Sequence, residues 1–253
     1  MTVATVVDLL PTVELAELVE RASLQTRVDR KYLLTPGQAG QFLDRLAETA
    51  APRVLCIDRR RDSGYDSLYL DTPDLAGYHL AARGRRRRFK VRRRTYLETG
   101  ETWLELKTRG PRGATVKQRS LEGSRAFLDD ALAAAGLPDL RGVPLVPVLM
   151  TSYRRTSLLL PGHGTDTDSR LTMDAGLRWS TPDGRQLELP DRVVVETKSG
   201  AQSSAADRLL WRAGCRPARI SKFGTGLAAL HPTLPANRWH PVLTRHLTPR
   251  ELS

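Results

Sequence analysis

The fold is decided by two neighbouring segments in which charged and apolar residues alternate: residues 88–97, RFKVRRRTYL, and residues 102–109, TWLELKTR. Side chains of a β-strand point alternately to its two faces. One face of both segments is therefore mostly apolar, and the opposite face carries Lys90, Arg92, Arg94, Glu105 and Lys107. This pattern predicts an antiparallel pair of strands with one side toward a core and one charged side.

The same alternation recurs in strand-like segments along the rest of the chain, with charged positions at Lys31, Lys117, Arg119, Arg155, Arg170, Glu196 and Lys198. One interpretation is that each strand simply has a solvated outer face. However, like charges opposite each other on neighbouring strands are destabilising, and at about 4 Å they repel by about 4 kcal/mol at an effective dielectric near 20. An anionic ligand would relieve that repulsion. The second interpretation is therefore a sheet that closes with its charged face inward and its apolar face against helices.

We expect an α+β fold, an eight-stranded antiparallel β-barrel tunnel with a basic lumen, flanked by helices. Such a barrel has room for side chains and one small ligand. Helices are predicted at residues 13–22, 36–49, 75–82, 124–135, 203–213 and 225–230. Strands are predicted at residues 27–34, 53–58, 65–71, 102–109, 114–121, 147–160, 169–174 and 192–199, with another ending near residue 97. Residues from 235 onward are expected to form a loosely packed tail.

The charge balance points to an anionic partner. The 253 residues include 40 Lys and Arg against 28 Asp and Glu, a net charge of +12, which suits nucleic acid, a membrane surface or a phosphorylated compound. No apolar run approaches the roughly 20 residues of a spanning helix, and residues 1–20 lack the basic region of a secretory signal. Two cysteines provide neither a disulfide framework nor a zinc site. We therefore expect a cytoplasmic protein without a transmembrane segment.

Two motifs favour other partners only weakly. Residues 85–88, RRRR, could form a nucleic-acid patch, but no aromatic residue that could stack on a base lies within this run. No nucleic-acid partner is therefore expected. Residues 224–226, GTG, could begin a helix whose N-terminus holds a phosphate, or they could be ordinary turn glycines.

The chemistry of the charged positions favours phosphate. Arginine binds phosphate oxygens through its bidentate fork and lysine binds them as a point charge. Carboxylates lie among these charged positions, at Glu105, Glu196 and Asp29. By themselves they would oppose the binding of an anion. They suit Mg²⁺ or Mn²⁺, which bind through one or two carboxylates together with substrate phosphates.

Nine segments in order resemble one known family. The chain is similar to the VTC domain, the polyphosphate polymerase domain of the vacuolar transporter chaperone complex and a branch of the triphosphate tunnel metalloenzymes, within the CYTH-like superfamily. The segments are DRKY (29–32), YDSLYLDT (65–72), KVRRR (90–94), LELK (104–107), VKQR (116–119), SYRRT (152–156), RLTMD (170–174), VVETKSG (194–200) and SKFGTG (221–226).

The resemblance implies transfer of the γ-phosphoryl of ATP, or another nucleoside triphosphate, onto a polyphosphate chain, with Mn²⁺ or Mg²⁺. It implies a catalytic set of basic residues, with Glu196 as the carboxylate that holds the metal and Glu105 as a second candidate. The usual glutamate of the opening motif is Asp29 here. The implied catalytic residues are Lys31, Arg92, Arg94, Lys107, Lys117, Arg155, Arg170 and Lys222, and the further substrate-binding residues are Lys90, Arg119, Lys198 and Tyr32.

The resemblance also implies a VTC domain over residues 25–232, preceded by an N-terminal helix (1–24) and followed by the tail (233–253). The partners of this domain would be a nucleoside triphosphate and polyphosphate. The resemblance does not identify a membrane partner protein. Two alternatives stay open: hydrolysis of triphosphate or polyphosphate at the same site, when water is the acceptor, and polyanion binding without turnover. Replacing Lys107 or Arg92 by alanine is expected to lower turnover while the fold stays intact or gains stability.

Overall fold

The computed structural model describes residues 2–22, 28–110, 115–162 and 167–247. The chain divides into two compact units. The first unit consists of Met1–Ser63, Tyr153–Leu177 and Leu189–Ala218, and the second of Gly64–Ser152, Arg178–Glu188 and Arg219–Ser253. Two long strands, β8 (Val146–Leu160) and β9 (Ser169–Ser180), contribute residues to both units.

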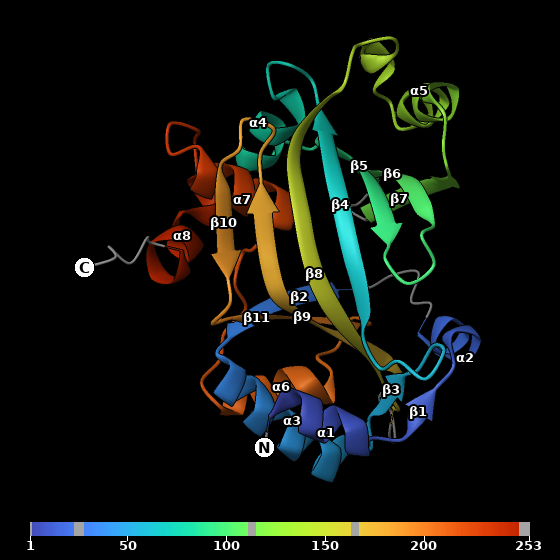
Figure 1. The fold of residues 1–253 in the computed structure, drawn as a ribbon, viewed down its shortest axis with the longest axis vertical. Helices are drawn as coiled ribbons and strands as arrows, with labels where there is room; N and C mark the ends of the chain where they lie inside the picture. The colour runs from blue at the N-terminus through green and yellow to red at the C-terminus, as the bar shows by residue number, and fades with distance from the viewer. Residues whose placement is uncertain (1, 23–27, 111–114, 163–166, 248–253) are drawn as a thin grey trace. The chain divides into compact units, whose positions relative to one another are not determined.

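The first unit is an antiparallel sheet with helices on one face. Strand β11 (Val193–Ser199) pairs antiparallel with both β2 (Val28–Leu34) and β9, and β8 follows β9 in the strand order. Helices α1 (Val3–Leu9), α3 (Pro36–Ala50) and α6 (Ala205–Arg212) lie on the same side of β2 and β11 (Figure 1). The side chains between them form one apolar core, which includes Val6, Leu34, Leu43, Leu46, Leu171, Val195 and Leu210.

Local sequence explains where α3 begins. The hydroxyl of Thr35 accepts a hydrogen bond from the backbone N–H of Gln38, and the side chain of Gln38 accepts one from the backbone N–H of Thr35. This capping box satisfies donors that the first turn leaves unpaired, and Pro36 occupies the first helical position, where its missing N–H costs nothing.

A small motif completes the first unit. Strand β1 (Thr12–Val13) pairs in parallel with β3 (Arg53–Leu55), and α2 (Leu15–Arg21) packs Leu18 against them. The helix predicted at residues 13–22 corresponds to α2, which is shorter because residues 12–13 pair with β3 instead. The segment 1–24, expected to be one N-terminal helix, contains two helices, α1 and α2, separated by β1.

The second unit repeats the arrangement with other elements. Strand β5 (Phe89–Tyr96) pairs antiparallel with β4 (Ser63–Asp71) and β6 (Thr102–Arg109), and β6 pairs with β7 (Thr115–Leu121). Helix α5 (Arg125–Ala134) and the 3₁₀ turn η2 (Pro138–Leu140) lie beside this group (Figure 1). The apolar face of the strands packs against α5, through Phe89, Val91, Leu104, Leu106, Leu128 and Leu132.

A second, aromatic cluster holds the C-terminal part of this unit. It joins α4 (Ala76–Ala82), α7 (Lys222–Leu230), the 3₁₀ turn η3 (Asn237–Trp239) and α8 (His240–His246), while β10 (Gln186–Leu189) pairs with β9. The ring of Tyr78 lies 5.4 Å from that of Trp239 and 6.2 Å from that of Phe223. Trp239 is buried. The expectation of a loosely packed tail from residue 235 is therefore wrong for the described residues, because η3 inserts an indole into this cluster.

The glycines of the GTG motif lie within α7 and not in a turn. A Cβ atom on Gly224 would lie 2.0 Å from the Trp239 ring, and one on Gly226 would lie 2.2 Å from the Trp179 ring. Both positions are therefore restricted to glycine by the close approach of an indole.

The α+β prediction, with antiparallel strands and flanking helices, is confirmed. In each unit the charged face of the sheet is opposite the face that packs on helices. Hydrogen bonds between the described residues do not close the sheet into a ring. Strand β9 is longer than predicted, and β10 was not predicted. None of the helices in the described part of the chain is both long enough and apolar enough to cross a membrane.

Candidate functional site

The first unit gathers charged residues on one face of β2, β11, β9 and β8. We call this the first charged face and define it by Asp29, Lys31, Arg155, Arg170, Thr172, Asp174, Glu196 and Lys198. The strand register places Lys31 opposite Glu196 and Glu196 opposite Thr172. In the next row, Asp29 is opposite Lys198 and Lys198 is opposite Arg170. Residues from four segments of the sequence therefore meet on one surface.

Glu196 lies between two lysines. Its Oε1 is 2.7 Å from Nζ of Lys31, and its Oε2 is 3.3 Å from Nζ of Lys198. Burial by itself would raise the pKa of this carboxyl, but Lys198, Lys31 and Arg155 together hold the pKa well below the usual value of 4.5. Glu196 is therefore ionised at neutral pH, although it is buried.

Lys198 is a buried cation whose charge is only partly compensated. Its burial lowers the pKa to about 7, against the attraction of Glu196 and with repulsion from Arg155 and Lys31. The ion pair with Glu196 lacks hydrogen-bond geometry, so the buried Nζ has no hydrogen-bond partner among the described residues. The buried Oγ1 of Thr172 likewise has none. These two atoms are polar groups that a ligand on this face would satisfy.

Arg155 is held in place by Asp174. Nε of Arg155 donates to Oδ1 of Asp174 at 2.6 Å, and Nη2 donates to Oδ2 at 2.8 Å. The guanidinium carbon also lies 5.4 Å from the centre of the Tyr153 ring. This two-point contact fixes the orientation of the guanidinium on the first charged face. Asp174 was not predicted as a site residue, although its place on the charged face follows from strand alternation.

The second unit carries its own charged surface on β5, β6 and β7. This second charged face is defined by Lys90, Arg92, Arg94, Glu105, Lys107, Lys117 and Arg119. Its register forms one row of three lysines, Lys90 opposite Lys107 and Lys107 opposite Lys117. In the adjacent row, Glu105 lies between Arg92 and Arg119.

Glu105 is the buried counter-charge of this face. Its Oε2 accepts from Nε of Arg92 at 2.5 Å, and its Oε1 forms an ion pair with Lys117. Burial opposes ionisation, but Arg92, Arg94 and Lys117 lower the pKa of Glu105 to about 2. The carboxylate therefore stays charged, and it partly neutralises a group of cations that would otherwise repel one another.

Aromatic rings support the arginines of this face. Arg92 lies 6.0 Å from the Tyr69 ring centre, Arg94 lies 5.2 Å from Tyr65, and Arg119 lies 4.5 Å from Trp103. The face of an aromatic ring attracts a guanidinium, and Nη1 of Arg92 also donates to the Tyr69 hydroxyl at 3.4 Å. These rings therefore help to position the arginines.

Lys222 is the first residue of α7 in the second unit. Its backbone carbonyl accepts a hydrogen bond from Nε1 of Trp179 at 2.7 Å. The preceding Ser221 caps the helix and also accepts from Nζ of Lys90 at 2.9 Å. The structure therefore brings the side chain of Lys90 to the start of α7.

Tyr32 does not belong to the charged face, contrary to its implied substrate-binding role. It alternates with Lys31 along β2, so its side chain enters the core beneath α6, where it is 0% exposed. Its hydroxyl donates to Oδ1 of Asp207 at 2.7 Å. The alternation of the strand would have given this result from sequence.

The family of the chain follows from its match to a known domain. The VTC domain model matches residues 26–143 and 140–231. The chain belongs to the VTC domain family. In this VTC domain, the matched residues include every residue of both charged faces and Lys222.

Other comparisons show more distant likeness. A candidate adenylyl cyclase of Hippeastrum with a dominant triphosphatase activity is 15% identical, with a TM-score of 0.43, over 84% of this chain and 100% of its own. A candidate adenylate cyclase of Vibrio parahaemolyticus is also 15% identical, with a TM-score of 0.41, over 75% of this chain and 87% of its own.

One curated protein also matches a short part of the chain. A 2-dehydro-3-deoxyphosphooctonate aldolase of Bdellovibrio bacteriovorus is 35% identical over 59 residues, which is 23% of this chain. The match spans only 20% of the length of the aldolase.

Proposed function

We propose that this VTC domain transfers the γ-phosphoryl group of a nucleoside triphosphate onto a polyphosphate chain. The observation that carries the proposal is the pair of charged faces, in each of which a buried, ionised carboxylate is surrounded by cations. Family membership supports the same chemistry. The excess of cations over carboxylates on both faces suits a substrate with several negative charges.

The cations of each face would bind phosphate groups. Arg155 and Arg92 are oriented by carboxylates, and arginine suits bidentate contact with phosphate oxygens. The row Lys90, Lys107 and Lys117 offers point charges whose mutual repulsion a phosphate chain would relieve. The proposed phosphate ligands are Lys31, Lys90, Arg92, Arg94, Lys107, Lys117, Arg119, Arg155, Arg170, Lys198 and Lys222.

A divalent cation fits the first charged face through Glu196. This carboxylate is ionised, and the register places it opposite Thr172, whose buried Oγ1 has no hydrogen-bond partner in the described part of the chain. Both carboxylates contact cations, but Glu105 fits less well. Arg92 donates a hydrogen bond to its Oε2 and Lys117 pairs closely with its Oε1, whereas Oε2 of Glu196 makes only the longer 3.3 Å contact with Lys198. The described residues contain no group of three His, Cys, Asp or Glu side chains able to hold a metal. Mg²⁺ or Mn²⁺ would therefore depend on Glu196 and substrate phosphates, and it would neutralise phosphate charge during transfer.

The residues of the chain would act by position and charge. Phosphoryl transfer needs an aligned donor and acceptor and stabilisation of the charge on the transferred group, and it needs no covalent protein nucleophile. Arginines fixed by Asp174 and Glu105 provide charges that are already oriented before substrate binds. Lys198 and Lys31 would hold an anionic oxygen close to Glu196.

We also propose, from the family resemblance, the eight-stranded tunnel with a basic lumen within a domain of residues 25–232. A pair of substitutions tests it. In a single lumen, one phosphate chain would contact both Lys31 and Lys107, so Lys31→Ala and Lys107→Ala would each weaken the same binding event. Two independent binding events, each weakened by only one of the two substitutions, would contradict a shared lumen.

The activity test uses the full chain with ATP and Mn²⁺ or Mg²⁺, and it measures long polyphosphate on a gel together with free phosphate. Glu196→Gln is expected to abolish polymer formation. The control is Glu188→Gln, which removes an exposed carboxylate of β10 that pairs with Arg178 of β9. This variant is expected to keep activity.

The products separate the alternatives. Polymer that disappears in the Glu196 variant supports the polymerase. Free phosphate without polymer would instead assign a triphosphate or polyphosphate hydrolase, because only the acceptor differs. Binding of polyphosphate with neither product would leave a polyanion-binding module.

A further inference from the structure

A cavity on the first unit lies at the C-terminal end of α6, away from the first charged face. Its volume is about 490 Å³, and it is lined by Arg208, Trp211, Arg212, Arg216 and Pro217. This size falls in the range of roughly 300–1,000 Å³ that is typical of small-molecule sites. Three of the five lining residues are arginines and none is acidic, so the cavity favours an anionic ligand.

A hydrogen bond to a buried tyrosine fixes the orientation of the Trp211 ring, which lines the cavity. Nε1 of Trp211 donates to the hydroxyl of Tyr32 at 3.0 Å, and that hydroxyl donates to Oδ1 of Asp207 at 2.7 Å. Asp207 is 0% exposed, and it also accepts hydrogen bonds from Thr197 and Ser204. The indole ring is therefore held by a buried, satisfied network, and its orientation costs little further entropy when a ligand binds.

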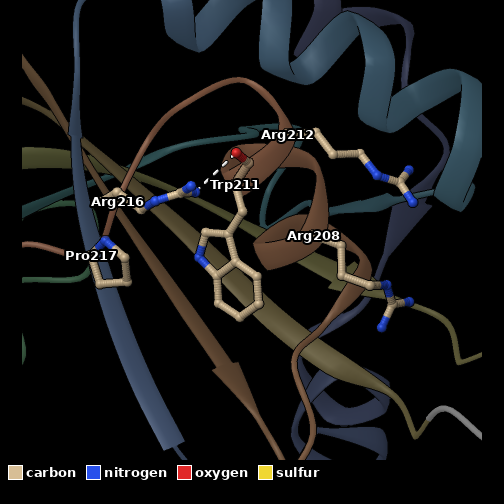
Figure 2. Close-up of a pocket in the computed structure, with 5 residues that line it drawn as sticks. All are labelled: Arg208, Trp211, Arg212, Arg216 and Pro217. Atoms are coloured by element: carbon tan, nitrogen blue, oxygen red, sulfur yellow. Dashed lines mark hydrogen bonds between the residues drawn. The ribbon is translucent and has the colours of Figure 1, made fainter.

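Backbone carbonyls orient two of the arginines around the ring. Arg208 donates through Nη1 to the carbonyl of Ser203 at 2.6 Å, and Arg216 donates through Nη1 to the carbonyl of Trp211 at 3.0 Å. Their positive charges are therefore held beside the indole. Figure 2 shows the Trp211 ring between Arg216 with Pro217 on one side and Arg208 on the other. Arg212 is exposed at the rim.

We propose that this cavity is a second ligand site and that it binds a nucleotide, whose base stacks on Trp211 and whose phosphates contact the three arginines. Aromatic faces and guanidinium planes are general platforms for bases, and arginine forks match phosphate oxygens. A phosphate chain has no base that could stack on the Trp211 ring. The site is separate from the first charged face, because Tyr32, which anchors Trp211, points to the opposite side of β2 from Lys31.

The experiment is a titration of the full chain with ADP in EDTA, followed by tryptophan fluorescence. Stacking on Trp211 is expected to quench its emission, and Trp211→Phe should remove that part of the signal. The double variant Arg212→Ala/Arg216→Ala should weaken ADP binding by about tenfold or more, because it removes charge-assisted hydrogen bonds. Arg86→Ala/Arg87→Ala removes the same charge from exposed positions of the second unit and should bind ADP like the wild type.

Adenosine and tripolyphosphate complete the test. Each carries half of the proposed recognition, so each should bind more weakly than ADP, and tripolyphosphate should not quench Trp211. Equal ADP affinity in the wild type and Arg212→Ala/Arg216→Ala, at equal melting temperatures, would overturn the site. Tripolyphosphate that binds as tightly as ADP and depends on the same arginines would overturn the nucleotide assignment, since it would show a plain polyanion site.

Discussion

The guanidinium of Arg155 donates hydrogen bonds to both carboxylate oxygens of Asp174, at 2.6 and 2.8 Å, and the Asp174 side chain is 1% exposed. The next residue along the chain, Arg154, makes the same two-point contact with Asp62, but there the side chains are 52% and 43% exposed. Two neighbouring arginines of β8 thus form equivalent ion pairs in different surroundings. The pairs differ in burial, and Arg155 also lies 5.4 Å from the centre of the Tyr153 ring.

Arg155→Ala should be far more destabilising than Arg154→Ala. Removal of Arg155 leaves a buried carboxylate without its counter-charge, which costs about 3–5 kcal/mol. An exposed pair is worth about 1 kcal/mol or less. Urea unfolding of both variants measures the difference. Equal losses of unfolding free energy would show that Asp174 finds another partner or that solvent reaches it.

Arg92→Ala and Lys107→Ala should differ in stability although both lower turnover. We expected from sequence that either change would leave the fold intact or stabilise it. The structure supports this for Lys107, which is exposed within a row of three lysines. Arg92 instead neutralises the buried carboxylate of Glu105, so its loss should cost about 2 kcal/mol. Thermal melts of the two variants would contradict this if Lys107→Ala were the less stable one.

The unfolding free energy should rise with pH above neutrality because of Lys198. Its pKa falls from 10.5 to about 7 on burial, so between these values the unfolded chain binds more protons than the native state. Stability then increases with pH, by up to about 1.4 kcal/mol per pH unit. Below pH 7 both states are protonated and the contribution is constant. Urea unfolding in EDTA from pH 7 to 10 should give a steeper rise for the wild type than for Lys198→Met, and parallel curves would refute the shift.

Gly226→Ala should destabilise the second unit and reduce activity. The added methyl group would collide with the Trp179 ring, whose N–H holds the carbonyl of Lys222, and overpacking costs about 1–3 kcal/mol. Gly37→Ala is the matched control, because the nearest atom to its Cβ would be 4.0 Å away. The control should be neutral or gain about 0.5–1 kcal/mol. Similar melting temperatures for the two variants would show that Trp179 can move aside.

Trp239 should be required for a stable second unit, although it lies beyond the predicted VTC domain. Its buried ring packs on Tyr78 and against Gly224, and Trp239→Ala should cost about 3–5 kcal/mol. A chain that ends at residue 232 should be destabilised similarly, and thermal melts of both variants measure the loss. A stable chain of residues 1–232 would restore the predicted boundary.

The sequence by itself determined most of the strands, the two faces of those strands and the family. These depend on local geometry, because side chains alternate along a strand whatever lies beside it. The charged positions from Lys31 to Lys198 could therefore be identified without a structure, and the same rule would have placed Tyr32 in the core.

Only the tertiary structure decided which charges meet. The partner of a buried carboxylate depends on the register between strands that are distant in sequence, as for Glu196 and Lys31. No local pattern encodes that register. The same holds for the indoles that exclude side chains at Gly224 and Gly226, and for the cavity of α6, whose ring is anchored through Tyr32, 179 residues away from Trp211. Contacts of this kind arise only when the chain folds back on itself.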